Sequence, residues 1–131
     1  MNILKLFIFS LFFISLSTQA VERSSAFIIK AYGDHFKVLA PSQFVGIKSI
    51  TKARQVAVII ENKTLSKLYG KIESSSGDQK VFVNTKPGQI PSTVEIKFQT
   101  NQRYFFYPLS PSSQEVELKI GQKAYEIPAK R

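Results

Sequence analysis

The chain has 131 residues, a formal net charge of +9 and no cysteine. The lack of cysteine excludes disulfide staples, thiolate nucleophiles and thiolate metal sites, so a domain of this length must be stabilised by hydrophobic packing. The single histidine, His35, also excludes a blue-copper site, which needs two histidines and a cysteine. The basic excess favours anionic partners, although the lysines and arginines are spread along the whole chain.

Residues 1–20, MNILKLFIFSLFFISLSTQA, have the pattern of a secretory signal peptide, with Lys5 before an apolar run and small residues around the cleavage position. The run from Leu6 to Leu16 is well short of the roughly 20 residues that cross a bilayer, so a cleaved leader is favoured over a stable membrane anchor. Loss of Lys5 would lower the net charge from +9 to +8. We therefore predict a single domain over 21–131 in the periplasm, with secretion outside the cell as the alternative, and no nucleic-acid partner.

From Ser25 onward the apolar residues follow a period of two, and a helical repeat is not sustained. Segment 26–40 predicts a hairpin about Gly33-Asp34 in which Ile29 lies opposite Val38. Segment 41–54 has no regular pattern and fits an edge strand, a crossover between sheets or one helical turn. The next strands are predicted at 55–61 (QVAVIIE), 67–74 (KLYGKIES), 80–84 (KVFVN) and 92–98 (STVEIKF).

Two more hairpins are predicted near the end of the chain. Segment 92–109 would turn at Asn101-Gln102, and segment 115–128 would turn at Gly121-Gln122 and set Leu118 opposite Tyr125. About seven to nine short strands result, which favours an immunoglobulin-like antiparallel β-sandwich over the alternative, a small β-barrel.

The stretch RYFFYPL, residues 103–109, is the densest aromatic segment of the predicted domain. The register of the hairpin over 92–109 assigns Phe105 and Tyr107 to the core. It assigns Tyr104 and Phe106 to the surface. Arginine and aromatic residues are enriched at protein interfaces. The candidate partner-binding residues are therefore Arg103, Tyr104 and Phe106, with Lys97 and Gln99 beside them on the neighbouring strand. One extra residue in the turn would exchange the inward and outward sets.

The sequence contains no complete catalytic motif: Ser49 to Lys52 match S-x-x-K, a pattern that occurs readily by chance, but its companion motifs are missing. His35 shows no sign of a catalytic triad, the carboxylates Glu115 and Glu117 are expected to face solvent, and neither a calcium loop nor a phosphate-binding glycine motif is present. We predict no catalytic residue, metal or cofactor. The favoured function is a non-enzymatic exported binding module: a periplasmic accessory protein, chaperone or adaptor that contacts another envelope or secreted protein through a strand edge or an aromatic face. The alternative is binding of an anionic envelope polymer or glycan through the basic surface.

Overall fold

A computed structural model describes residues 22–88 and 90–129 of the chain. The predicted signal peptide, residues 1–20, lies outside this range, and so do Val21, Gln89, Lys130 and Arg131. In the described range, no helix is long and apolar enough to span a membrane.

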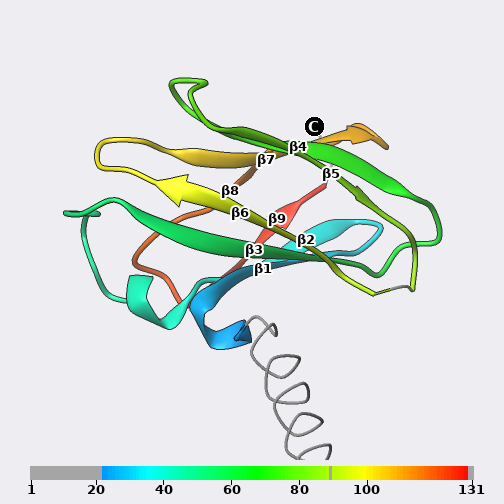
Figure 1. The fold of residues 1–131 in the computed structure, drawn as a ribbon. Coiled ribbons are helices and arrows are strands. Elements are labelled where there is room, and N and C mark those ends of the chain that lie inside the picture. The colour runs from blue at the N-terminus through cyan, green and yellow to red at the C-terminus, as the bar shows by residue number, and fades with distance from the viewer. Residues whose placement is uncertain (1–21, 89, 130–131) are drawn as a thin grey trace, which may run out of the picture.

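The described residues form nine strands in two packed sheets (Figure 1). One sheet has the strand order β6-β3-β1-β2-β9 and the other the order β5-β4-β7-β8. The strands are β1 (Ala26–Ala31), β2 (His35–Leu39), β3 (Arg54–Asn62), β4 (Leu68–Ser74), β5 (Lys80–Thr85), β6 (Ser92–Phe98), β7 (Tyr104–Ser110), β8 (Val116–Glu117) and β9 (Ala124–Pro128). The prediction of an all-β, two-layer sandwich is confirmed at this level.

The hairpin of β1 and β2 has the predicted register, with Ile29 opposite Val38 and Lys30 opposite Lys37. The irregular segment that follows contains a short 3-10 helix, η2 (Ser42–Phe44), and buries Phe44 in the core. β2 ends beside the start of β1, and this segment leads from there to β3 on the other side of β1. As a result β3 pairs with β1 in parallel, and the segment is a crossover within one sheet, neither an edge strand nor the predicted crossover between sheets.

The predicted hairpin over 92–109 is wrong. β6 pairs with β3 in the five-stranded sheet, whereas β7 pairs with β4 and β8 in the other sheet. The chain passes from one layer to the other between Phe98 and Tyr104, with Asn101 at a φ of 60°. A crossover of this kind leaves the same alternation of apolar residues as a hairpin, because each strand still buries one side against the shared core.

The predicted hairpin about Gly121-Gln122 is also wrong. β8 pairs with β7, with Val116 opposite Phe106, while β9 pairs with β2, with Tyr125 opposite Val38. Gly121 adopts a φ of 98°, a conformation that glycine reaches without a steric penalty. Its N–H donates to the Phe44 carbonyl at 2.8 Å, so the connection packs on the first crossover instead of closing a hairpin.

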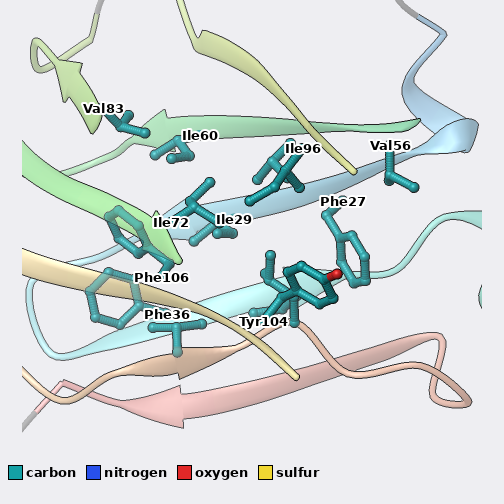
Figure 2. Packing of buried hydrophobic residues seen from close by; sticks show 14 of the residues in the cluster. Phe27, Ile29, Phe36, Val56, Ile60, Ile72, Val83, Ile96, Tyr104 and Phe106 are labelled. Carbon is teal, nitrogen blue, oxygen red and sulfur yellow. The ribbon is translucent and has the colours of Figure 1, made fainter. Parts of the chain in front are cut away.

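The core lies between the two sheets, where Figure 2 shows Phe36 and Ile72 near the ring of Phe106, and the Tyr104 ring nearer to Phe27. The Tyr104 ring stacks on Phe98 with 4.1 Å between ring centroids. Its hydroxyl donates to the Lys97 carbonyl at 3.0 Å and accepts the Gln99 N–H at 2.7 Å. The Tyr104 side chain therefore connects β7 in one sheet to the end of β6 in the other sheet by hydrogen bonds.

Gly70 in β4 is required by a close approach of β7. A Cβ atom at this position would lie 2.6 Å from the Tyr107 carbonyl oxygen and 2.7 Å from a ring carbon of Phe106. The ladder between β4 and β7 is also irregular here, between Tyr69 and Gly70. Gly70 thus makes room for the buried Phe106 ring.

Candidate functional site

The predicted orientation of the RYFFYPL aromatics is wrong. Tyr104 is 1% exposed and Phe106 is 0% exposed, so neither side chain points to solvent. The cause is the strand partner: β7 takes its register from β4, where Ile72 lies opposite Phe106, rather than from β6. Phe105 and Tyr107, predicted to be core, are instead the half-buried residues on the outer side of β7.

The other three candidates are at the surface but do not share one face. Arg103 is exposed beside β8, where its Nε and one Nη donate to both Glu117 oxygens at 3.0 and 2.8 Å. Lys97 is exposed on β6, in the opposite sheet, and Gln99 is half-buried just after that strand. Lys97 and Gln99 meet Tyr104 only through their backbone groups. Whether any of these residues binds a partner stays a prediction.

The outer side of the four-stranded sheet carries a different aromatic cluster. Tyr69 on β4 is 39% exposed and Phe82 on β5 is 55% exposed, and both lie on the same side of the sheet as Phe105 and Tyr107. We call this surface the aromatic face. It is defined by the four rings and the two cations that lie over them: Tyr69, Phe82, Phe105, Tyr107, Lys71 and Arg103.

The rings of the aromatic face are ordered by cross-strand contacts. Tyr69 and Phe82 are almost parallel, with an interplanar angle of 5° and 6.1 Å between centroids, and Phe105 and Tyr107 are 5.8 Å apart. Lys71 lies opposite Phe82 on one neighbouring strand and opposite Tyr107 on the other, so it joins the two pairs in one row. The face therefore extends over three adjacent strands, β5, β4 and β7.

Both cations of the aromatic face are held above rings. The Lys71 Nζ lies 5.4 Å from the Tyr107 centroid, and the Arg103 guanidinium lies 5.0 Å from the Phe105 centroid. These distances are within the range of cation–π contacts. An exposed aromatic surface with fixed cations can accept apolar and acidic groups of a partner side by side.

Carboxylates fix the two cations in these positions. Lys71 Nζ lies 3.0 Å from Glu73, and this hydrogen bond lowers the pKa of the Glu73 carboxyl below its ordinary value. The hydrogen bond from Arg103 lowers the pKa of Glu117 in the same way. Both carboxylates therefore stay ionised at neutral pH.

The sequence pattern contained a signal for Tyr69 and Phe82. Leu68, Gly70 and Ile72 alternate along β4 and are buried, which leaves Tyr69 on the outer side of the same strand. In β5 the buried Val83 likewise leaves Phe82 outside. An aromatic residue at a solvent-facing strand position was therefore predictable in both segments, but neither Tyr69 nor Phe82 is among the predicted site residues.

The edges formed by β5, β6 and β8 are less open than the aromatic face. The edge strands β5 and β6 lie on the same side of the sandwich and are linked by Thr85, whose hydroxyl donates to Ser92 Oγ at 2.8 Å. The Lys97 N–H donates to Gln79 Oε1 at 3.4 Å on the same side. At the other end of the four-stranded sheet, the edge strand β8 has only two residues. Short and lysine-bearing edges disfavour the addition of another strand.

His35 lies in a separate cluster at the β1–β2 turn. Its ring stacks on Tyr32 with 4.7 Å between centroids, and its Nδ1 lies 2.6 Å from the Asp34 carboxylate. The adjacent side chains thus converge at this turn, and the hydrogen bond to His35 lowers the pKa of Asp34. Over residues 22–88 and 90–129, no three histidine, aspartate or glutamate side chains come together in a way that could hold a metal ion.

No protein-family model, curated protein or solved structure matches the chain. The basis for a functional assignment is therefore the aromatic face, the charge distribution and the signal-peptide pattern at the N-terminus.

Proposed function

We propose that the chain is a non-enzymatic binding module that recognises another envelope or exported protein through the aromatic face. The observation that carries this proposal is the stacked pair of Tyr69 and Phe82, which remains exposed and continues into Phe105 and Tyr107. Exposed aromatic clusters of this kind mark interaction sites, and aromatic and arginine side chains dominate the binding energy of interfaces.

The aromatic face is a better candidate than a strand edge for this role. Recognition by strand addition needs a long, open row of backbone groups. The β5 and β6 edges are bridged by the hydrogen bond of Thr85 with Ser92, and they carry exposed Lys80 and Lys97. A partner that covers Tyr69 and Phe82 would bury large apolar rings without disturbing this edge.

The proposed compartment is the periplasm. Residues 1–20 would direct export and then be cleaved. The support for export is the pattern of the leader sequence, and mass spectrometry of the purified protein would test it, since a chain starting at Val21 is expected. We also propose an immunoglobulin-like arrangement. Its support is the repeated passage of the chain between the two sheets, from β3 to β4, β5 to β6, β6 to β7 and β8 to β9, which is typical of Greek-key sandwiches.

Site-specific photocrosslinking in the producing cells tests the proposal. A photoreactive residue at Asn84, which is exposed and lies opposite Tyr69, should capture a defined protein. The same residue at Leu65, which is fully exposed in the β3–β4 loop, serves as the control and should not capture that protein. The captured protein is then identified and its affinity for the purified chain is measured.

The double variant Tyr69→Ala and Phe82→Ala should weaken binding of the captured protein by more than about tenfold, because interface aromatics commonly contribute above 1 kcal/mol each. Its matched control, Leu65→Ala with Ile90→Ala, removes two exposed apolar side chains from loops and should leave the affinity unchanged. Equal capture from Asn84 and Leu65, or an affinity that the first variant does not alter, would contradict the proposal.

A further inference from the structure

A second surface feature lies at the end of the sandwich where the crossovers meet, on the left in Figure 1. A hollow of about 390 Å³ is formed there by three segments that are distant in sequence, at 48–50, 98–104 and 117–120. A second hollow of about 360 Å³ lies next to it, and the two share Lys48, Ser49 and Ile50 as a common wall. We call the two adjacent hollows together the basic end.

The charges lining the basic end are almost all positive. The first hollow is lined by Lys48, Arg103 and Lys119, and the second adds two further cations, Lys52 and Arg54. Glu117 is the only acidic side chain among the described residues that line either hollow, and it is already paired with Arg103. In the described part of the chain, Lys48, Lys52 and Arg54 make no salt bridge. The basic end therefore has positive charge without a protein counter-charge.

Neutral polar groups stand between these cations. Gln99, Asn101 and Gln102 line the first hollow, and Ser49 lies on the wall between the two. Gln102 is positioned by its Oε1, which accepts hydrogen bonds from the Ser75 hydroxyl and the Ser76 N–H, each at 3.1 Å. Side-chain amides both donate and accept hydrogen bonds, so they suit ligands rich in hydroxyl groups.

The first hollow has no exposed aromatic ring against which an apolar side chain of a ligand could pack. Phe98 and Tyr104 line it but are each only 1% exposed, since they stack on one another. An acidic peptide would therefore find charge but no aromatic anchor, whereas an acidic sugar chain would meet cations for its carboxylates and amides for its hydroxyls.

We propose that the basic end binds an anionic polysaccharide, with Lys48 and Lys52 attracting its carboxylates and Gln99 and Asn101 contacting its hydroxyls. This ligand is different from the protein partner of the aromatic face, and among the residues named for the two surfaces only Arg103 belongs to both. The double variant Tyr69→Ala and Phe82→Ala should therefore leave polysaccharide binding unchanged, so each proposal can fail without the other.

The test measures binding of polygalacturonate to the purified chain by calorimetry at low and high salt. The charge-reversal variant Lys48→Glu with Lys52→Glu should weaken binding by about tenfold or more at low salt, and the wild-type affinity should fall as salt rises. The control variant, Lys63→Glu with Lys67→Glu, makes the same change in net charge at the opposite end of β3, where both lysines are exposed, and should bind within about twofold of the wild type.

A second variant tests the amide contacts. Asn101 has a φ of 60°, so Asn101→Gly keeps the backbone conformation, and combined with Gln99→Ala it removes two amides without altering charge. This variant should bind polygalacturonate about threefold or more weakly but poly-L-glutamate as the wild type does. Three results would overturn the proposal: no binding of polygalacturonate, equal losses in the two charge-reversal variants, or binding of poly-L-glutamate as tight as that of polygalacturonate. Thermal melts confirm that each variant is folded.

Discussion

The inner and outer sides of β7 carry the same kinds of residue in opposite environments. Tyr104 and Phe106 point into the sandwich and are almost completely buried, while Phe105 and Tyr107 lie on the outer side under Arg103 and Lys71. The difference shows that the aromatic content of RYFFYPL has two separate roles. The inner pair stabilises the fold, and the outer pair is the continuation of an exposed surface that includes Tyr69 and Phe82.

The largest expected effect on stability comes from the inward side chains of β7. Phe106→Ala should lower the free energy of unfolding by about 3–5 kcal/mol, because it removes a fully buried ring and leaves a cavity. Phe105→Ala, its neighbour on the outer side, should cost about 1 kcal/mol or less. Denaturant unfolding of both variants checks the difference. Equal destabilisation would contradict the assignment of the two sides.

Gly70→Ala should also lower the free energy of unfolding, by about 1–3 kcal/mol. The new methyl group would lie 2.7 Å from the buried Phe106 ring and 2.6 Å from the Tyr107 carbonyl oxygen, so β7 would have to move away. Gly33→Ala is the control, since a Cβ there meets no atom within 4 Å. Thermal unfolding distinguishes them, and a Gly70→Ala protein as stable as wild type would refute the close approach of β7.

The stability of the fold should depend on pH through Tyr125, a second tyrosine that packs against the core. Burial raises the pKa of Tyr125 from 10.0 to about 12, while its hydroxyl donates to the Glu117 carbonyl at 2.6 Å and accepts the Lys119 N–H at 2.7 Å. The folded state therefore holds this proton more tightly than the unfolded state. The resulting stability, about 2–3 kcal/mol, is complete below pH 10 and is lost as the pH rises through 12.

The measurement is the difference in unfolding free energy between wild type and Tyr125→Phe from pH 9 to pH 12. The variant cannot ionise at this position, so the wild type should lose stability relative to it over the upper part of that range. A difference that stays constant with pH would show that Tyr125 ionises alike in both states.

The smallest expected effect concerns the ion pair on the outer side. The Arg103 side chain is 66% exposed, so its contact with Glu117 should contribute at most about 1 kcal/mol, and less at high salt. Because the folded pKa of Glu117 is lowered, the contribution is present above its ordinary value of 4.5 and is lost as the pH falls below it. A double-mutant cycle of Arg103→Ala and Glu117→Ala at pH 7 and pH 3 checks this; a coupling larger at pH 3 would contradict it.

The strands and most of their buried sides could be predicted from alternation alone. In KLYGKIES, small or aliphatic residues alternate with polar or aromatic ones, and the buried positions of Leu68 and Ile72 agree with that alternation. The first hairpin was equally clear, since the turn at Gly33-Asp34 determines its pairing.

RYFFYPL could not be assigned in this way. Apolar residues occupy both sides of that strand, so alternation does not distinguish Tyr104 and Phe106 from Phe105 and Tyr107. The choice depended on which strand β7 pairs with, and the true partner, β4, is separated from it in sequence by two other strands. Pairing between distant strands arises from the packing of whole sheets, which the period-two pattern does not encode.

The basic end could not be predicted from the sequence for a similar reason. Lys48, Lys52, Arg54, Arg103 and Lys119 are dispersed in the sequence, and only the crossovers bring them to one end of the sandwich. An even distribution of charge along a chain therefore does not imply an even distribution over the folded surface.

The central claim is that the outward rings of the four-stranded sheet recognise a protein and contribute little to stability. The most direct test is the affinity of the protein captured by crosslinking at Asn84 for the double variant Tyr69→Ala and Phe82→Ala. Binding weaker by more than about tenfold, with an unfolding free energy within about 1 kcal/mol of the wild type, is the predicted result. An unchanged affinity in a folded variant would contradict it.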